Sequence, residues 1–206
     1  MDKTKEFLRI LKRAEKTFGR SDKRLAGDMR GWKESWKVLI STMLSAQSRD
    51  EVTIPIAESL FRKYGTLEAL SRARFLGVLS VLRSMNYNRT KSRNLISTAK
   101  ILVKDFHGRV PREIDDLVQL PGVGRKTATL VVSECFGKPG ICVDTHVHRI
   151  SNVFGFVDTK TPEGTEMALR SFVPERYWSR INRLFVLWGQ EVPGRERERL
   201  EAALVG

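Results

Sequence analysis

The chain has 206 residues, of which 41% are hydrophobic and 30% are charged, a balance typical of a folded globular protein. Lys and Arg total 37 against 24 Asp and Glu, so the formal net charge is +13. This charge favours a polyanionic partner, with nucleic acid first, although a merely basic protein would have the same composition.

The sequence contains no apolar run near the roughly 20 residues needed to cross a bilayer. Its first residues lead into an amphipathic stretch rather than an apolar signal core. We therefore expect an intracellular, cytoplasmic protein that associates with the nucleoid. The two cysteines, Cys135 and Cys142, have apolar neighbours and no close histidine pair. We expect buried, reduced thiols and no metal site.

Apolar residues recur at helical spacing along the first half of the chain. The predicted helices cover residues 5–18, 32–47, Pro55 to about Tyr64, a short segment capped by Thr66, residues 74–83, and Thr90 to Phe106. Pro55 suits the first turn of its helix, because proline needs no hydrogen-bond acceptor there. Gly65 and Gly108 are expected to end the helices that precede them.

The second half continues in the same way. Pro111 is predicted to begin a helix that buries Ile114, Leu117 and Val118. A glycine turn and another helix follow, then a break at residues 137–140. Further helices are predicted from about Asp144, from Pro162, from Pro174, and over the charged run 196–204, where Leu200 and Leu204 would pack. No run alternates apolar and polar residues as a strand does, so the predicted fold class is all-α.

One stretch carries the features of a phosphate clamp. Leu120-Pro121-Gly122-Val123-Gly124-Arg125-Lys126-Thr127-Ala128 reads as a tight glycine turn that opens a helix. Gly122 and Gly124 permit a turn with positive φ and leave backbone N–H groups uncovered by side chains. Such groups at the start of a helix bind anions, and in a basic protein a nucleic-acid phosphate is the expected anion.

This stretch, followed by Val143-Asp144-Thr145-His146, resembles the helix-hairpin-helix DNA glycosylases, and it is most similar to their endonuclease III branch. Leu44-Ser45-Ala46-Gln47 resembles the motif before a DNA-facing loop of that branch, and the likeness extends over about residues 30–190. The resemblance implies two helical domains with a DNA-binding cleft between them. A six-helix domain would cover residues 28–138, with the hairpin motif at about 111–136. Residues 1–27 and 139–206 would form the second domain.

By the resemblance, Lys126 and Asp144 are the catalytic residues. A neutral lysine would attack C1′ of a flipped damaged nucleotide and form an imine, and β-elimination would then cut the strand. Partial burial among basic residues would favour the neutral amine. Asp144 would stabilise positive charge on the sugar. Without the motif, Lys126 would read as an exposed helix lysine and Asp144 as a helix N-cap, and for Asp144 both roles are compatible.

Other residues are assigned to DNA contacts by the same resemblance. Gln47 would fill the gap left by the flipped nucleotide, or remain a solvated loop residue. Tyr87 would act as a wedge, or pack on the core, and Asn88 would border the lesion pocket. The further expected contacts are Gly122, Val123, Gly124, Arg125, His146 and Arg149. The two arginines could equally be ordinary solvated charges, and His146 could be structural.

The chain departs from the branch in two places. Relatives usually end in a four-cysteine loop that holds a four-iron four-sulfur cluster, but here Glu191 to Arg199 contains no cysteine. We expect no cluster and no other cofactor. The second departure is Asn86-Tyr87-Asn88, where the branch tends to have Gly-Leu-Tyr. Because these positions border the lesion pocket in relatives, the preferred lesion does not follow from the resemblance.

The leading hypothesis is a monomeric, bifunctional base-excision-repair glycosylase and abasic-site lyase that acts on damaged double-stranded DNA. Oxidised pyrimidines are the expected lesions, and mismatched uracil or thymine and 8-oxoguanine are the alternatives. A glycosylase without lyase activity, and a non-catalytic helix-hairpin-helix module that only binds DNA, are the competing hypotheses. Lys126 argues against the first, because a purely hydrolytic enzyme needs no amine there, and the pairing of Lys126 with Asp144 argues against the second.

Overall fold

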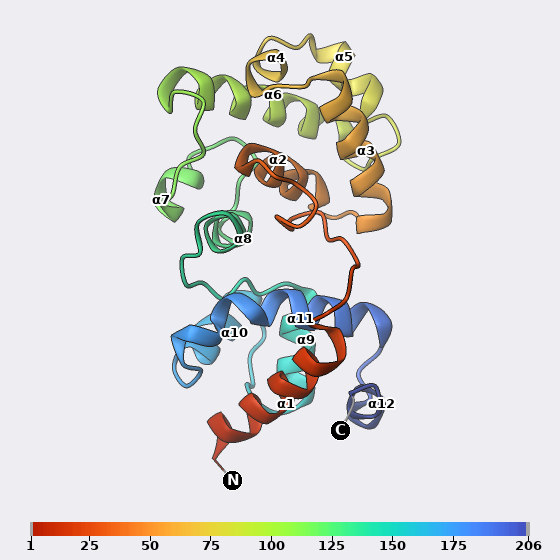
Figure 1. Cartoon of the computed structure of the whole chain (residues 1–206), viewed down its shortest axis with the longest axis vertical. Coiled ribbons are helices and arrows are strands. Elements are labelled where there is room, and N and C mark those ends of the chain that lie inside the picture. Colours follow the sequence, from red (N-terminus) through yellow and green to blue (C-terminus); the bar gives the residue numbers. More distant parts are fainter. Residues whose placement is uncertain (1, 205–206) are drawn as a thin grey trace. The chain divides into compact units, whose positions relative to one another are not determined.

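A computed structural model of the chain describes residues 2–204. In this range all regular secondary structure is helical and there is no strand (Figure 1). The predicted all-α class is confirmed. The chain divides into two compact units. Unit 1 joins the two ends of the chain, up to Lys23 and from Gly137 onward, and unit 2 is Arg24–Phe136. No helix of the described residues is both long and apolar enough to span a membrane.

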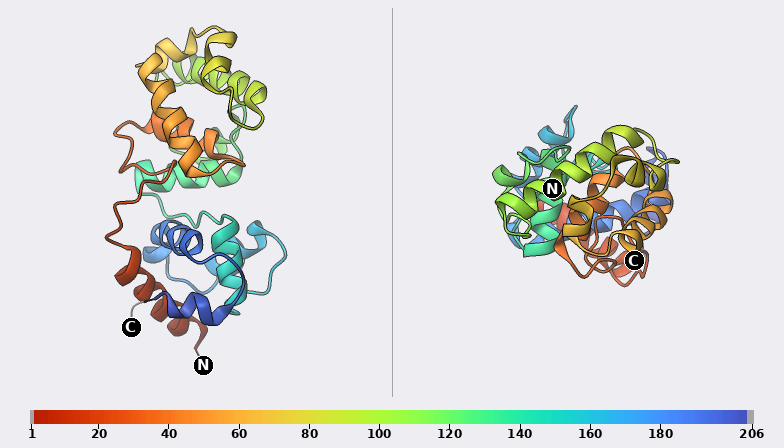
Figure 2. Two further views of the ribbon diagram at one scale, coloured as in Figure 1. Left: turned by 90° about the vertical axis from the view of Figure 1, so that its right-hand side faces the viewer. Right: turned by 90° about the horizontal axis from the view of Figure 1, so that it is seen from above.

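Unit 2, all of which the structure describes, has seven helical segments where the resemblance implied six. They are α2 (Ser35–Ser45), α3 (Asp50–Lys63), α4 (Leu67–Ser71), α5 (Phe75–Val81), α6 (Asn88–Asp105), α7 (Ile114–Leu117) and α8 (Arg125–Phe136). Eight of the eleven residues of α2 are buried, so this helix is central to the unit. It lies beside α3 and α8, while α6 lies beside α4 and α5 (Figure 2).

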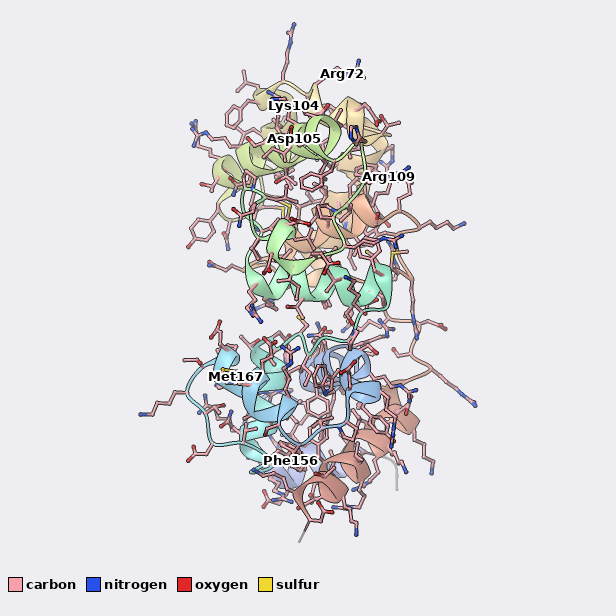
Figure 3. The ribbon with its side chains drawn as sticks, turned by 90° about the vertical axis from the view of Figure 1, so that its left-hand side faces the viewer. Arg72, Lys104, Asp105, Arg109, Phe156 and Met167 are labelled. Carbon is pink, nitrogen blue, oxygen red and sulfur yellow. The ribbon has the colours of Figure 1, made fainter. Side chains whose placement is uncertain are left out.

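Unit 1 is built around aromatic side chains. Its helices are α1 (Lys3–Phe18), α9 (Thr145–Val153), α10 (Pro162–Arg170), the 3-10 turn η1 (Glu175–Tyr177), α11 (Trp178–Glu191) and α12 (Arg197–Ala202). Phe7 meets Phe156 edge to face at 5.0 Å, and Phe185 meets Trp188 in the same way at 5.5 Å. Figure 3 shows Phe156 within this unit and Met167 of α10, which is 73% exposed, at its surface. The contact of Phe7 with Phe185, whose ring centroids are 6.0 Å apart, joins α1 to α11.

The C-terminal run behaves as predicted. Within α12 and the residue pair that follows it, Leu200 and Leu204 are buried. The indole N–H of Trp188 donates to the Leu200 carbonyl at 3.1 Å. This run therefore closes the core of unit 1 by apolar packing.

Two proline predictions were wrong. Pro55 is the sixth residue of α3 rather than part of its first turn, because the helix already begins at Asp50. Asp50 and Glu51 occupy that first turn, where acidic side chains favour the helix dipole. Pro111 precedes α7 by three residues, and Glu113 is still extended, so the helix before the hairpin has only four residues. By contrast, Thr66 caps α4 as predicted, with its hydroxyl accepting from the Ala69 N–H at 3.1 Å.

Candidate active site

The hairpin between α7 and α8 is a tight turn. The Val123 N–H donates to the Leu120 carbonyl at 3.0 Å, and Gly122 has φ +79°. With Pro121 at the second position, these are the features of a type II turn, which requires positive φ at its third residue. Leu120 and Val123 are buried and fix the turn to the core of unit 2. The sequence therefore explains both the turn type and its attachment.

Two residues of α6 support this turn, and neither was predicted from the sequence to do so. The Thr98 hydroxyl donates to the Pro121 carbonyl at 3.0 Å. The Asn94 side chain lies so close to Gly122 that an added Cβ would be 2.5 Å from its Nδ2. These contacts span more than 20 residues of sequence, so no local pattern could reveal them.

The hairpin offers fewer backbone N–H groups to an anion than predicted. Val123 uses its N–H within the turn, so that group is not available to a phosphate. Gly124 does not have positive φ, and an added Cβ there would meet nothing within 4 Å. Its carbonyl accepts from the Ala128 N–H at 3.0 Å and so starts α8. The N–H groups at the start of α8, together with that of Gly122, are therefore the candidate groups for binding a phosphate.

Lys126 is the second residue of α8 and is exposed. The partial burial expected for it is not found, because Ala128, Val131 and Val132 form the buried face of this helix. Arg125 beside it is also exposed. An accessible amine thus lies in the same helical turn as the candidate phosphate-binding N–H groups.

Asp144, in unit 1, is the N-cap of α9. Its Oδ1 accepts from the N–H groups of His146 at 3.0 Å and of Val147 at 2.9 Å. These bonds satisfy two of the donors that a helix start leaves unpaired and fix the carboxylate in orientation. Within the described residues, no hydrogen bond uses Oδ2. One carboxylate oxygen therefore has a structural role, and the other is available for chemistry.

Arg149, predicted to contact phosphate, holds the backbone of its own unit. Its guanidinium donates to the carbonyls of Gly189 at 2.9 Å, Val192 at 3.0 Å and Gly194. Burial lowers the pKa of Arg149, while the negative charge of Asp144 raises it. This arginine therefore connects α9, which Asp144 caps, to the end of α11 and the segment that follows.

His146 completes this arrangement in unit 1. The ring of His146 and the guanidinium of Arg149 both lie against Gly189, where an added Cβ would be 2.4 Å from His146 Nδ1 and 2.9 Å from Arg149 Nη2. Gly189 thus permits a close approach of α11 to α9 that a larger residue would prevent. His146 is placed to brace α9 near Asp144.

Two loops of unit 2 contain the other predicted DNA contacts. The Gln47 loop (residues 46–49) follows α2, and the Tyr87 loop (residues 83–87) precedes α6. Gln47 and Tyr87 are exposed, and Tyr87 is 65% exposed, so neither packs on the core. Both have φ of +55°, a left-handed conformation that side-chain-bearing residues seldom adopt.

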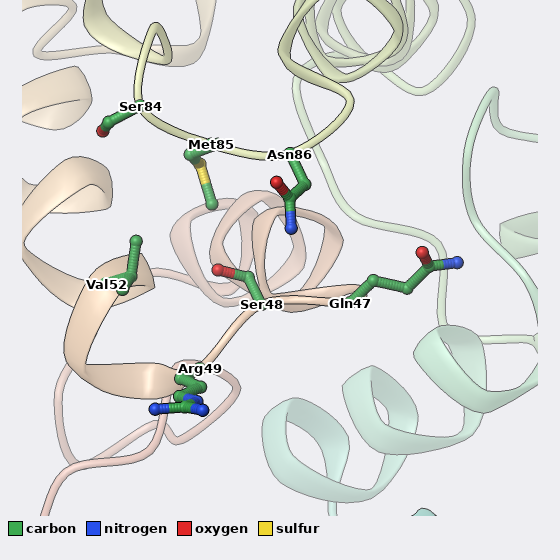
Figure 4. Close-up of a pocket in the computed structure, with 7 residues that line it drawn as sticks. All are labelled: Gln47, Ser48, Arg49, Val52, Ser84, Met85 and Asn86. Carbon is green, nitrogen blue, oxygen red and sulfur yellow. The ribbon is translucent and has the colours of Figure 1, made fainter.

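The two loops line one cavity of about 510 Å³, together with Val52 of α3. In Figure 4, Met85 and Asn86 point from the Tyr87 loop toward Ser48, while the Gln47 side chain extends away from them. Asn88, predicted to border the lesion pocket, is not among the lining residues. Its amide donates to the Arg83 carbonyl at 3.0 Å and closes the Tyr87 loop.

Comparisons with known proteins agree with this geometry. Residues 40–175 match the model of the HhH-GPD superfamily base excision DNA repair proteins. Endonuclease III of Thermotoga maritima is 42% identical over 159 residues, which cover 77% of this chain and 75% of that protein. Endonuclease III of Bacillus subtilis is 35% identical over 156 residues, or 75% and 71% of the two chains.

Solved structures give the same result. A trapped covalent intermediate of endonuclease III with DNA, an estranged-adenine complex, superposes with a TM-score of 0.83 at 32% identity, covering 91% of this chain and 86% of the other. A thermostable thymine-DNA glycosylase shares the fold, with a TM-score of 0.79 at 20% identity, over 95% and 89% of the two chains.

Proposed function

Because the chain belongs to the HhH-GPD superfamily of base excision DNA repair proteins, we propose that it acts on DNA as the endonuclease III enzymes do. It is a bifunctional enzyme, a DNA glycosylase and abasic-site lyase, and its partner is damaged double-stranded DNA. The observation that carries the assignment of its chemistry is the exposed Lys126 in the first turn of α8, beside the N–H groups that bind phosphate.

Lys126 is the proposed nucleophile. The damaged nucleotide leaves the base stack, since its C1′ is unreachable within the duplex. The neutral amine then forms a bond to C1′, and the bond from C1′ to the base breaks, with the base leaving as its electron pair takes up a proton. Ring opening gives an imine that acidifies C2′. Loss of a C2′ proton expels the 3′ phosphate, which cuts the strand, and water finally releases the lysine.

Asp144 is the proposed electrostatic partner of this lysine. Positive charge develops on the sugar as the base departs, and a fixed carboxylate lowers the energy of that state. Oδ1 holds the carboxylate on the start of α9, which leaves Oδ2 for the sugar or for proton transfer. Gln47 and Tyr87 are proposed to enter the duplex, where they replace the flipped nucleotide and separate its neighbours.

Oxidised pyrimidines are the proposed lesions, and the nucleoid is the proposed place of action. No iron–sulfur cluster is required in this proposal. The sequence has two cysteines, whereas a cubane cluster needs four thiolates. We propose that the hydrogen bonds of Arg149 and the apolar packing of α12 support the end of unit 1 without a cluster.

The assignment is tested with duplexes that each carry one defined lesion, incubated with and without borohydride, which reduces an imine to a stable crosslink. The wild-type protein should be trapped on at least one oxidised pyrimidine. Lys126→Ala should still bind the duplex but give no crosslink and no strand cleavage. Lys104→Ala, which removes an exposed lysine on α6, is the matched control and should be trapped normally.

Two results would reject the assignment. Crosslinking by a folded Lys126→Ala variant would require another nucleophile. Excision of a base without any crosslink by the wild-type protein would identify a glycosylase that lacks the lyase step.

A further inference from the structure

Lys91, in the first turn of α6, is the only lysine in the described part of the chain that is buried, with 9% of its surface exposed. Burial lowers its pKa. Lysine is rarely buried, because removing an ammonium group from water is costly unless a partner compensates. A lysine in such a position calls for a structural reason.

The contacts of Lys91 supply that reason. Its Nζ donates to the carbonyl of Leu44 at 2.7 Å. Leu44 lies in the last turn of α2, where carbonyls lack helical partners and a positive charge favours the helix dipole. The backbone N–H of Lys91 donates to the Tyr87 carbonyl at 2.9 Å. This second bond is the first hydrogen bond of α6, with Tyr87 as the N-cap, and any residue but proline would form it at position 91. The side-chain bond to Leu44 is the contact specific to lysine, and it ties the start of α6, directly after the Tyr87 loop, to the helix end that precedes the Gln47 loop.

The loops on either side of this bridge need such support. Gln47 and Tyr87 both have φ of +55°. Non-glycine residues remain in this conformation only where the surrounding structure holds them. The two loops also line the same cavity, so a movement of one loop against the other would change its shape.

We propose that Lys91 is a positioning residue that holds the Gln47 loop and the Tyr87 loop in fixed register, so that both enter the duplex together. The inference rests on the proposed function for its consequence in catalysis, but its structural part stands on the contacts alone. Lys91 itself touches neither substrate nor reacting atoms. It acts through the two residues that replace and separate bases.

This role predicts a split between the two activities. Excision of an intact damaged base requires the nucleotide to be extruded and its place filled, which depends on both loops. An abasic site has no base to unstack, so its cleavage depends less on them. Loss of a purely structural contact would instead reduce both activities in proportion to the fraction of unfolded protein.

The test compares Lys91→Met with Lys100→Met, which changes an exposed lysine on the same helix to the same residue. Under single-turnover conditions, Lys91→Met should excise a damaged base about tenfold or more slowly. Its cleavage of a preformed abasic site should stay within about twofold of wild type. Lys100→Met should match the wild type in both. Lys91→Gln, which is polar but too short to reach the Leu44 carbonyl, should repeat the split if Lys91→Met fails to fold.

Hydrogen exchange of the free proteins tests the structural part without DNA. In Lys91→Met, exchange should accelerate in both loops, residues 46–49 and 83–87, and remain unchanged in α8. An equal fall of both activities, or unchanged exchange in either loop, would overturn the proposal. If the wild-type protein acts on no lesion, the proposed function fails, and exchange in the two loops alone decides whether Lys91 holds them in register.

Discussion

Replacing Arg149, a half-buried residue of α9, should destabilise unit 1 strongly. In Arg149→Leu, the carbonyls of Gly189, Val192 and Gly194 lose their donor. These carbonyls lie at the end of α11 and beyond it, where the helix supplies no partner. The leucine preserves much of the side-chain volume, so the change removes the hydrogen bonds and the charge that faces Asp144 without opening a large cavity.

The magnitude follows from the number of bonds. A hydrogen bond from a charged donor contributes more than the usual net value of about 1 kcal/mol, but water can reach part of this site. A loss of about 3 kcal/mol in the free energy of unfolding is therefore expected. For a protein of this size, each kcal/mol lowers the melting temperature by about 2–4 °C, so the midpoint should fall by about 6–12 °C.

The assay is thermal unfolding followed by calorimetry or tryptophan fluorescence. Arg199→Leu is the matched control, because Arg199 pairs with Glu196 at 2.9 Å while both side chains are mostly exposed. Such a surface pair contributes about 0–1 kcal/mol, so this variant should melt within a few degrees of wild type. Equal melting temperatures for the two variants would refute the view that Arg149 supports the segment after α11.

Three further predictions concern the site and its surroundings. Asp144→Asn should keep the N-cap and the wild-type melting temperature, because asparagine caps a helix as well as aspartate does. It should nevertheless lower the rate of single-turnover excision by about 10²-fold or more, and full activity would show that the negative charge of Asp144 has no role in catalysis. Gly122→Ala should lower the free energy of unfolding, measured with denaturant, by about 1–3 kcal/mol, because alanine disfavours the positive φ and its Cβ would contact Asn94. Gly124→Ala should change the free energy of unfolding little, and equal effects of the two substitutions would contradict the turn geometry. Burial and the charge of Glu134 raise the pKa of Cys135 to about 12 from 9.0. Since the unfolded thiol ionises first, stability should fall as the pH rises from about 9 toward 12, and Cys135→Ala should remove that part of the slope.

Helix positions and caps could be predicted because their causes are local. Apolar spacing identified the buried faces of the helices, and Thr66 and Asp144 cap α4 and α9 through bonds to N–H groups two or three residues ahead. The prolines were harder, because the same fixed φ fits the first turn of a helix, a position one turn inside it, or an extended approach. For Pro55, the signal in the sequence was the acidic pair Asp50 and Glu51, which favours a helix that begins before the proline.

The candidate site was predictable only as far as its motif extends. The turn with Gly122 and the position of Lys126 follow from adjacent residues. The function of Arg149 does not, because its acceptors lie 40 to 45 residues away. Nothing in the sequence distinguishes Lys91 from the other helix lysines, since its acceptor is 47 residues distant. Side chains that bond to a remote backbone leave no periodic or compositional trace.

These contacts also revise what the net charge of +13 means. Several cations bind backbone carbonyls of their own unit rather than solvent or phosphate: Lys91, Arg149, Arg13 to Leu204 at 2.9 Å, and Arg183 to Ser21 and Lys23, both at 3.0 Å. Two exposed cations, Arg72 and Lys104, lie at the end of unit 2 opposite to α8 (Figure 3). Part of the basic composition is thus structural, and part lies far from the hairpin.

Net charge is therefore a poor measure of how this chain grips DNA. The salt dependence of binding counts the phosphates that are neutralised, with a slope near 0.9 per contact, and does not count the cations in the sequence. Cations that bond to carbonyls within a unit release no DNA counterions, because they bind no phosphate. We propose that the contacts to the DNA backbone come mainly from the N–H groups at the start of α8, from Arg125 and from the cations near the two loops. Basic composition correctly indicated the partner, while the hairpin geometry indicates where that partner is held.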